Sequence, residues 1–155
     1  MTAVTYKTYE GFPSEEILEQ LTTINQEIFL FGETAEHLAA ALRERENILI
    51  CYAFYDTSVI GFKVGFQERS RYFESWRGGV LPDFRGQNIA QELLQIQHEW
   101  CKNQGFKIII TTTNSQNTPM LIVNLRGGFT IIGTFINQRN IMKVMLQKRL
   151  VSTLE

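Results

Sequence analysis

The sequence has few of the residues that build disulfide frameworks, metal centres or membrane anchors. It contains two cysteines far from each other, Cys51 and Cys101, and two histidines far from each other, His37 and His98. The cysteines are expected to be free thiols, no metal site is expected, and both histidines are expected to be solvated on helix surfaces. No apolar run approaches the ~18 residues that cross a bilayer, so no membrane partner is expected.

Targeting signals and concentrated charge of one sign are also missing. The first residues, MTAVTYKTYEGF, show no basic segment followed by an apolar one, so a cytoplasmic location is expected. The net charge is −1, and the 15 basic residues are dispersed rather than gathered into a patch with aromatic side chains. Nucleic acid is therefore not expected as a partner.

The overall amino-acid composition is typical of one globular domain. The chain has 155 residues, 44% of them hydrophobic and 20% charged, so a single domain spanning residues 1–155 is expected. Residues 1–36 carry seven Glu and one Lys, whereas the rest of the chain carries 14 basic and nine acidic residues. Two interpretations stay open: carboxylates that favour helix starts, or one side facing a cationic partner while the other holds an anion.

The apolar periodicity predicts an α/β (α+β) fold in the order β-α-α-β-β-β-α-β-α-β-β, with one mixed sheet flanked by helices. The expected strands cover residues 4–9, 48–55, 59–67, 72–81, 107–113, 129–135 and 141–146. Polar residues before three helical patterns are expected N-caps: Ser14, Thr34 and Asn117. The second helix is expected to bury Leu38, Ala41 and Leu42.

The stretch from residue 80 to residue 104 organises the rest of the chain. A strand ends at Val80 and Leu81, a turn follows, and residues 85–90 lead into a helix with apolar residues at 89, 93, 96 and 100. A glycine-containing loop that enters a helix leaves backbone N–H groups without partners, and with the helix dipole they can hold a phosphate. An ordinary strand-to-helix turn is the alternative.

Glycines mark two further places in the predicted strands. Gly61 and Gly65 indicate a bulge or close packing in the strand 59–67. Gly78 and Gly79 indicate a bulge that would separate the strand 72–81 from the next one and open a slot for a ligand. A glycine pair without such a role is the alternative.

Two motifs in this order of elements resemble the GCN5-related N-acetyltransferases. Within VLPDFRGQNIA, the family pattern R/Q-x-x-G-x-G/A is met by Arg85, Asn88 and Ala90. The second pattern, N-x-x-A-x-x-x-Y-x-x-x-G-F, is met at its equivalent places by Asn117, Met120, Asn124, Gly128 and Phe129. The likeness covers essentially the whole chain. It departs from the pattern at Asn88, which tolerates positive φ, and at Asn124, which replaces the usual tyrosine proton donor.

The resemblance implies acetyl-CoA as the co-substrate. The implied pyrophosphate contacts are the backbone N–H groups of a six-residue loop: Arg85, Gly86, Gln87, Asn88, Ile89 and Ala90. Val80 and Leu81 are implied to offer backbone groups to the pantetheine arm and the thioester carbonyl. Asn117 is expected to cap its helix and, at the same time, to contact the cofactor.

Two residues are candidates for the chemistry. Glu74 lies six residues before Val80, as the catalytic glutamate does in histone-type members of the family, and strand alternation would place both on one face. It would act as the base for the amine, directly or through a water. The alternative is a surface carboxylate paired with Arg69 or Arg71. Asn124 would hydrogen-bond the sulfur or the pantetheine amide, or have no ligand contact.

The predicted function is acetyl transfer from acetyl-CoA to a primary amine of a small molecule or peptide, by direct attack in a ternary complex. The alternative is a non-catalytic module of the same fold that binds or senses acyl-CoA. Phe29 and Phe31 together with Glu27 and Glu33 suit an acceptor that is a cation with an apolar part, although helix packing explains the phenylalanines equally well. A homodimer is one option for its assembly.

Overall fold

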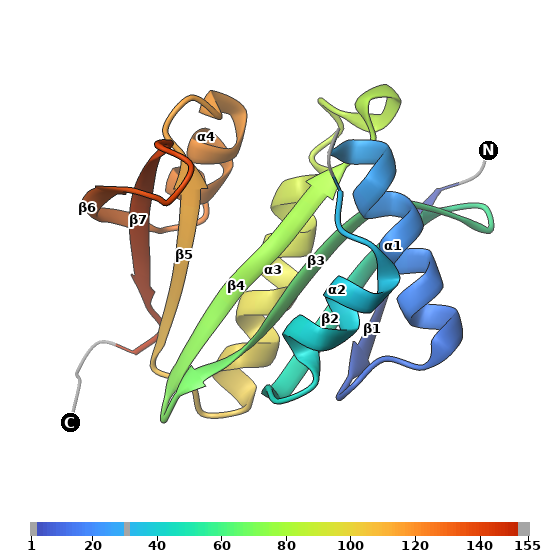
Figure 1. Cartoon of the computed structure of the whole chain (residues 1–155), viewed down its shortest axis with the longest axis horizontal. Helices are drawn as coiled ribbons and strands as arrows, with labels where there is room; N and C mark the ends of the chain where they lie inside the picture. The colour runs from blue at the N-terminus through green and yellow to red at the C-terminus, as the bar shows by residue number, and fades with distance from the viewer. Residues whose placement is uncertain (1–2, 30–31, 152–155) are drawn as a thin grey trace.

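The chain folds around one seven-stranded sheet in the computed structural model, which describes residues 3–29 and 32–151. The strands lie in the order β1-β2-β3-β4-β5-β7-β6, and β4 and β5 pair in parallel (Figure 1). They are β1 (Val4–Glu10), β2 (Glu46–Tyr55), β3 (Ser58–Arg69), β4 (Tyr72–Val80), β5 (Ile108–Asn114), β6 (Thr130–Ile136) and β7 (Met142–Arg149). The helices are α1 (Glu15–Ile28), α2 (Ala35–Leu42), the short 3₁₀ helix η1 (Pro82–Phe84), α3 (Ile89–Asn103) and α4 (Thr118–Arg126). The predicted α/β fold and element order are confirmed.

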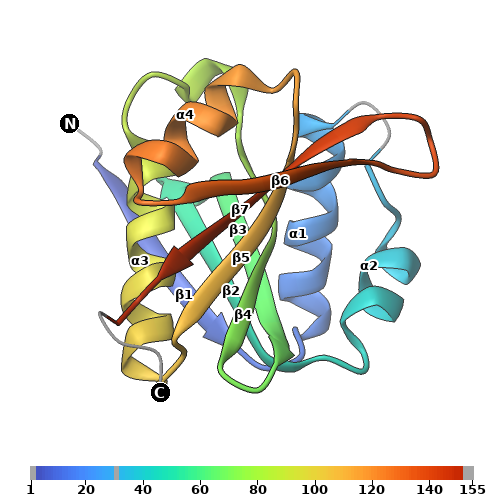
Figure 2. The same ribbon diagram turned by 90° about the vertical axis from the view of Figure 1, so that its left-hand side faces the viewer.

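The sheet separates two apolar cores. Figure 2 shows α3 on one side of the sheet and α1 and α2 on the other. Under α3, residues such as Leu93 and Leu94 pack against Phe73 and Ile109, whereas a second cluster lies under α1 and α2. Each face therefore stabilises the sheet independently. None of the described helices is long and apolar enough to cross a membrane.

The helix starts follow from local capping. The side chains of Ser14 and Thr34 each accept a hydrogen bond from the backbone N–H three residues later, and Asn117 does the same for Met120. The three predicted N-caps are thus confirmed. Within α2, however, the predicted burial of Ala41 is wrong, because it is Ala39 that faces the core beside Leu38 and Leu42.

His98 is buried, which contradicts its predicted place on a solvated helix surface. It is 3% exposed, and its ring packs edge-on against Phe129. Its Nδ1 lies 2.9 Å from Nζ of Lys148 on β7. Burial, together with the charges of Lys148 and Lys63, lowers the pKa of His98 to about 2. The imidazole is therefore neutral and accepts a hydrogen bond from the Lys148 ammonium.

The parallel strands β4 and β5 pair only at their beginning. Their register is Tyr72 with Ile108, Phe73 with Ile109 and Glu74 with Ile110. Beyond these residues the two strands diverge, as Figure 1 shows. The remaining parts of β4 and β5 are therefore free to line a cleft in the middle of the sheet.

A bulge in β4 reverses the faces of this strand. In its pairing with β3, Arg77 lies opposite Val64 and Ser75 lies opposite Gly65, so Trp76 is an extra residue. The bulge predicted at Gly78 and Gly79 is wrong in position, because both pair regularly with β3. An extra residue shifts the alternation of side chains by one, so residues before and after Trp76 no longer follow one pattern.

Candidate active site

Two adjoining cavities occupy the place where β4 and β5 diverge. The first, here called the loop cavity, measures about 480 Å³ and is bordered by the loop before α3. The second, here called the strand cavity, measures about 540 Å³ and lies between β4, β5 and α4. Both are lined by Phe29, Gly78, Asn117 and Met120. The two cavities therefore form one cleft with its junction at these four residues.

The loop between η1 and α3 presents a row of backbone donors to the loop cavity. Gly86 and Asn88 have positive φ values of 76° and 65°. The N–H of Arg85, which was expected to contact the pyrophosphate, instead donates to the Pro82 carbonyl over 3.2 Å. The first helical hydrogen bond runs from the N–H of Glu92 to the carbonyl of Asn88, and the N–H groups from Gly86 to Gln91 make no hydrogen bond within the described residues. The positive φ of Asn88 accords with the tolerance of asparagine for this conformation. Free donors at a helix N-terminus attract an anion.

Most of the residues proposed for the cofactor line the loop cavity. They are Val80, Arg85, Gly86, Asn88, Ile89, Ala90 and Asn117. Leu81 does not line it, because its N–H donates to the Ile60 carbonyl on β3 over 2.9 Å. The side chain of Gln87 is exposed outside the cavity. Arg126 at the end of α4 also borders the cavity, although no sequence pattern marked it.

The backbone of Val80 turns toward the cleft. Since Leu81 directs its N–H to β3, the neighbouring Val80 directs its own backbone groups to the opposite side, where β5 has moved away. The Val80 carbonyl accepts a hydrogen bond from Nε of Arg85 over 3.0 Å. This contact ties the Arg85 side chain to the end of β4 and leaves the backbone N–H donors of the loop clear.

The strand cavity has polar walls. Asn124 on α4 is 3% exposed, and its Nδ2 donates to Oγ1 of Thr113 over 3.1 Å. Both residues line the cavity. The position expected to carry a tyrosine thus holds a short amide whose orientation is fixed by β5.

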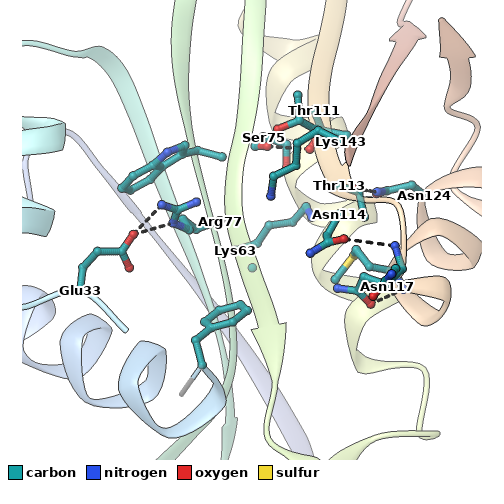
Figure 3. A pocket seen from close by; sticks show the side chains of 16 residues that line it. Glu33, Lys63, Ser75, Arg77, Thr111, Thr113, Asn114, Asn117, Asn124 and Lys143 are labelled. Atoms are coloured by element: carbon teal, nitrogen blue, oxygen red, sulfur yellow. Dashed lines mark hydrogen bonds and ion pairs between the residues drawn. The ribbon is translucent and has the colours of Figure 1, made fainter. Parts of the chain in front are cut away.

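Among the described residues, three cations and one acid line the strand cavity. The cations are Lys63, Arg77 and Lys143, which reach it from β3, β4 and β7, and the acid is Glu33 (Figure 3). Nε of Arg77 donates to Oε1 of Glu33 over 3.1 Å, and Nδ2 of Asn25 donates to Oε2 over 2.7 Å. Burial acts to raise the pKa of Glu33, but these hydrogen bonds and the charge of Arg77 lower it overall. Glu33 is therefore an ionised partner of Arg77.

Lys63 is the residue that sequence reasoning overlooked. It is 8% exposed, and burial lowers the pKa of its ammonium group to about 8. An ionisable residue within the apolar strand VIGFKVGFQ was the available signal, because a lysine is almost never fully buried unless it has a partner. Lys143 gave no such signal, since its strand alternates polar and apolar residues.

The structure places Glu74 outside the cleft. It lies opposite Phe66 on the face covered by α1 and α2, whereas Val80 lies opposite Gly61 on the α3 face. The predicted common face is wrong, because the extra residue Trp76 separates the two positions. Its charged neighbours are Arg45, Glu68 and Arg77 rather than Arg69 or Arg71.

Glu74→Gln is expected to leave turnover unchanged and to raise thermal stability at pH 7. Burial raises the pKa of Glu74, and Arg45 and Arg77 oppose this only in part. A carboxyl whose pKa is higher in the folded state costs stability where it is ionised, and that cost vanishes below its unfolded pKa, near pH ~4.3. Melting curves at pH 7 and below pH ~4, with initial rates, check this. A turnover loss that grows at low pH would instead identify a catalytic base.

The acidic N-terminal segment does not supply the strand cavity with carboxylates beyond Glu33. Glu16, Glu19 and Glu27 line a separate cavity of about 690 Å³ between α1 and the β2–β3 turn. Of the aromatic pair proposed for the acceptor, Phe29 lines the cleft, and Phe31 lies outside the described residues.

Comparison with known proteins identifies relatives of this fold. The sequence model of the acetyltransferase (GNAT) family matches residues 14–123. The ribosomal-protein-S18-alanine N-acetyltransferase of Escherichia coli superposes with a TM-score of 0.79 at 14% identity, covering 96% of this chain and 97% of that chain. The structure of yncA from Salmonella typhimurium with its cofactor acetyl-CoA gives 0.76 at 15% identity, covering 96% of each chain.

A third structure, the paia N-acetyltransferase of Thermoplasma acidophilum in complex with coenzyme A, gives a TM-score of 0.70 at 18% identity, covering 92% of this chain and 99% of that chain. Identities this low show a shared fold. A search of curated proteins gives no significant match.

Proposed function

Because the chain belongs to the acetyltransferase (GNAT) family, we propose that it transfers an acetyl group from acetyl-CoA to a primary amine. The observation that carries this proposal is the row of unpartnered N–H groups from Gly86 to Gln91, which opens onto the cleft between β4 and β5. These donors fit a pyrophosphate, and the cleft beyond them leads to the strand cavity.

The loop cavity holds the phosphate end of the co-substrate in this proposal. Arg85 and Arg126 border the same cavity and add positive charge at its mouth. The pantetheine arm follows the backbone of β4 at Val80, so the thioester reaches the junction of the two cavities near Gly78 and Met120. The acceptor amine then enters through the strand cavity.

The amine attacks the thioester carbonyl directly. A C–N bond forms, the C–S bond breaks, CoA leaves as the thiolate, and the proton released by the amine passes through water to that sulfur. An ammonium placed near Lys63 and Lys143 has a lowered pKa, because like charges disfavour its charged form. The cavity thereby favours the neutral, nucleophilic amine without a carboxylate base, which accords with the position of Glu74 on the other face.

Asn124 holds the departing sulfur in this proposal. Asn124→Leu is expected to lower kcat about tenfold and to leave the KM for acetyl-CoA unchanged, because one hydrogen bond to a charged group contributes about 1.5 kcal/mol. Initial rates of CoA release, followed with a thiol reagent, check this, and a melting curve confirms that the variant folds. An unchanged kcat would assign Asn124 to structure alone, through its bond to Thr113.

The second candidate is a non-catalytic module that binds acyl-CoA, which Asn124 in place of a tyrosine favours. CoA release from acetyl-CoA in the presence of a panel of amines separates the two functions. Release that depends on the amine supports the transferase. Tight binding of acetyl-CoA without release on any amine supports the module.

Assembly and location remain predictions from the sequence. The cytoplasmic location, the homodimer and the absence of nucleic-acid and membrane partners rest on composition and on the family resemblance. Size-exclusion chromatography with light scattering would measure the mass of the particle in solution.

A further inference from the structure

The acceptor end of the cleft carries more positive charge than an ordinary amine site requires. We propose that the acceptor is an amine that also bears an anionic group, a carboxylate or a phosphonate, and that Lys63 and Lys143 bind this group in the strand cavity. The inference rests on the proposed acetyl transfer and names the class of its acceptor.

Positive charge exceeds negative charge among the described residues of the strand cavity. Of the described residues that line it, four are charged: Glu33, Lys63, Arg77 and Lys143. Glu33 is already bound by Arg77 and Asn25. Lys63 and Lys143 form no ion pair with any acidic side chain in the described part of the chain. Two positive charges therefore remain for whatever enters the cavity.

The burial of the Lys63 ammonium is energetically unfavourable. Its side chain is almost fully buried, and a Cβ added at Gly78 would lie 3.6 Å from its Nζ. The glycine thus leaves β4 open beside the lysine, which passes close to the strand and reaches the cavity. A buried ammonium without an acidic partner is unfavourable, and an anion in the cavity removes that penalty.

The two lysines point into the same cavity. Figure 3 shows the side chains of Lys63 and Lys143 extending from β3 and β7 into the strand cavity. Arriving from different strands, they can contact one anionic group from two sides. Charge-assisted hydrogen bonds from ammonium groups to a carboxylate or phosphonate are the strong ones in proteins.

Two other occupants fit these observations less well. The phosphates of CoA have their own donors at Gly86–Gln91, and neither lysine lines the loop cavity. A diamine or a basic peptide would bring further positive charge toward Lys63 and Lys143, and like charges brought together cost several kcal/mol. The earlier expectation of a cationic acceptor loses its support because Glu33 is occupied and Glu27 lies elsewhere.

The test measures the acetylation of four amines of similar length by the full chain in the presence of acetyl-CoA. The amines are 4-aminobutyrate, 3-aminopropylphosphonate, pentylamine and putrescine. We expect kcat/KM for the two anionic amines to exceed that for the other two by roughly 10- to 100-fold, the value of one charge-assisted hydrogen bond. Their relative rates distinguish carboxylate from phosphonate. A preference for pentylamine or putrescine would overturn the inference.

Two variants locate the effect. Lys143→Gln is expected to lower kcat/KM for the preferred anionic amine by roughly 10- to 100-fold, with the KM for acetyl-CoA unchanged. Lys63→Met is expected to do the same while raising the melting temperature, since it removes a buried charge. Lys102→Gln, which removes an exposed lysine on α3, serves as the control. If Lys143→Gln and Lys63→Met both keep the wild-type preference for anionic amines, the proposal is contradicted.

Calorimetry separates this inference from the proposed function. Titration of 4-aminobutyrate and of pentylamine into the CoA-loaded protein measures binding without turnover. Selective binding of 4-aminobutyrate, lost in Lys143→Gln, supports the anion site even if no amine releases CoA. Binding of neither amine together with turnover of pentylamine alone would reject the anion site and retain the acetyltransferase.

Discussion

Ala90→Glu is expected to reduce acetyl-CoA affinity by more than about 100-fold while leaving the fold intact. Ala90 lies in the first turn of α3 and lines the loop cavity, so the new carboxylate would stand among the N–H donors proposed for the pyrophosphate. Like charges placed together in a binding site cost several kcal/mol, and each 1.4 kcal/mol is a factor of about ten in affinity. An acidic residue in the first turn of a helix is otherwise favourable, because it interacts with the helix dipole.

Isothermal titration with acetyl-CoA and a melting curve measure the two parts of this expectation. Gln95→Glu adds the same charge to the exposed side of the same helix and serves as the matched control. Affinity that falls equally in both variants would reflect the net charge of the protein. If Ala90→Glu binds acetyl-CoA with wild-type affinity, the loop cavity is not the phosphate site.

Gly65→Ala is expected to destabilise the protein by about 3 kcal/mol, at the upper end of the usual cost of overpacking a core. A Cβ at Gly65 would lie 2.2 Å from Cε1 of Phe73 and 2.6 Å from the backbone oxygen of Glu74. Phe73 is 0% exposed and packs edge-on against both Trp100 and Phe106, so its ring has little room to move. For a chain of this length, that loss corresponds to a fall in Tm of roughly 6–12 °C.

Gly61→Ala is the matched control on the same strand. The nearest atoms to a Cβ there are Cδ1 of Leu93 at 3.3 Å, the Gly79 carbonyl oxygen at 3.4 Å and Cγ2 of Ile89 at 3.4 Å. These contacts need a movement of only a few tenths of an ångström, so a loss below about 1 kcal/mol is expected. Equal Tm values for the two variants would show that Phe73 relaxes and that the close packing is unimportant.

The difference between the predicted and the observed β4 shows how one residue changes a site. The sequence YFESWRGGV is compatible with regular strand alternation over its full length, which predicts Glu74 on the same face as Val80. The bulge at Trp76 depends on pairing with Val64 and Gly65 of β3, which no local pattern in β4 records. A candidate base was therefore assigned to the wrong face of the sheet.

By itself, the sequence determined the order of the elements and the three helix caps. Each depends on residues within a few positions of one another, where side-chain chemistry and backbone preference decide the conformation. The tertiary structure alone decided the bulge at Trp76, the burial of His98 and the meeting of Lys63 and Lys143 in one cavity. These depend on contacts between strands far apart in the chain, and the separation of β4 from β5 creates the space in which the two lysines meet.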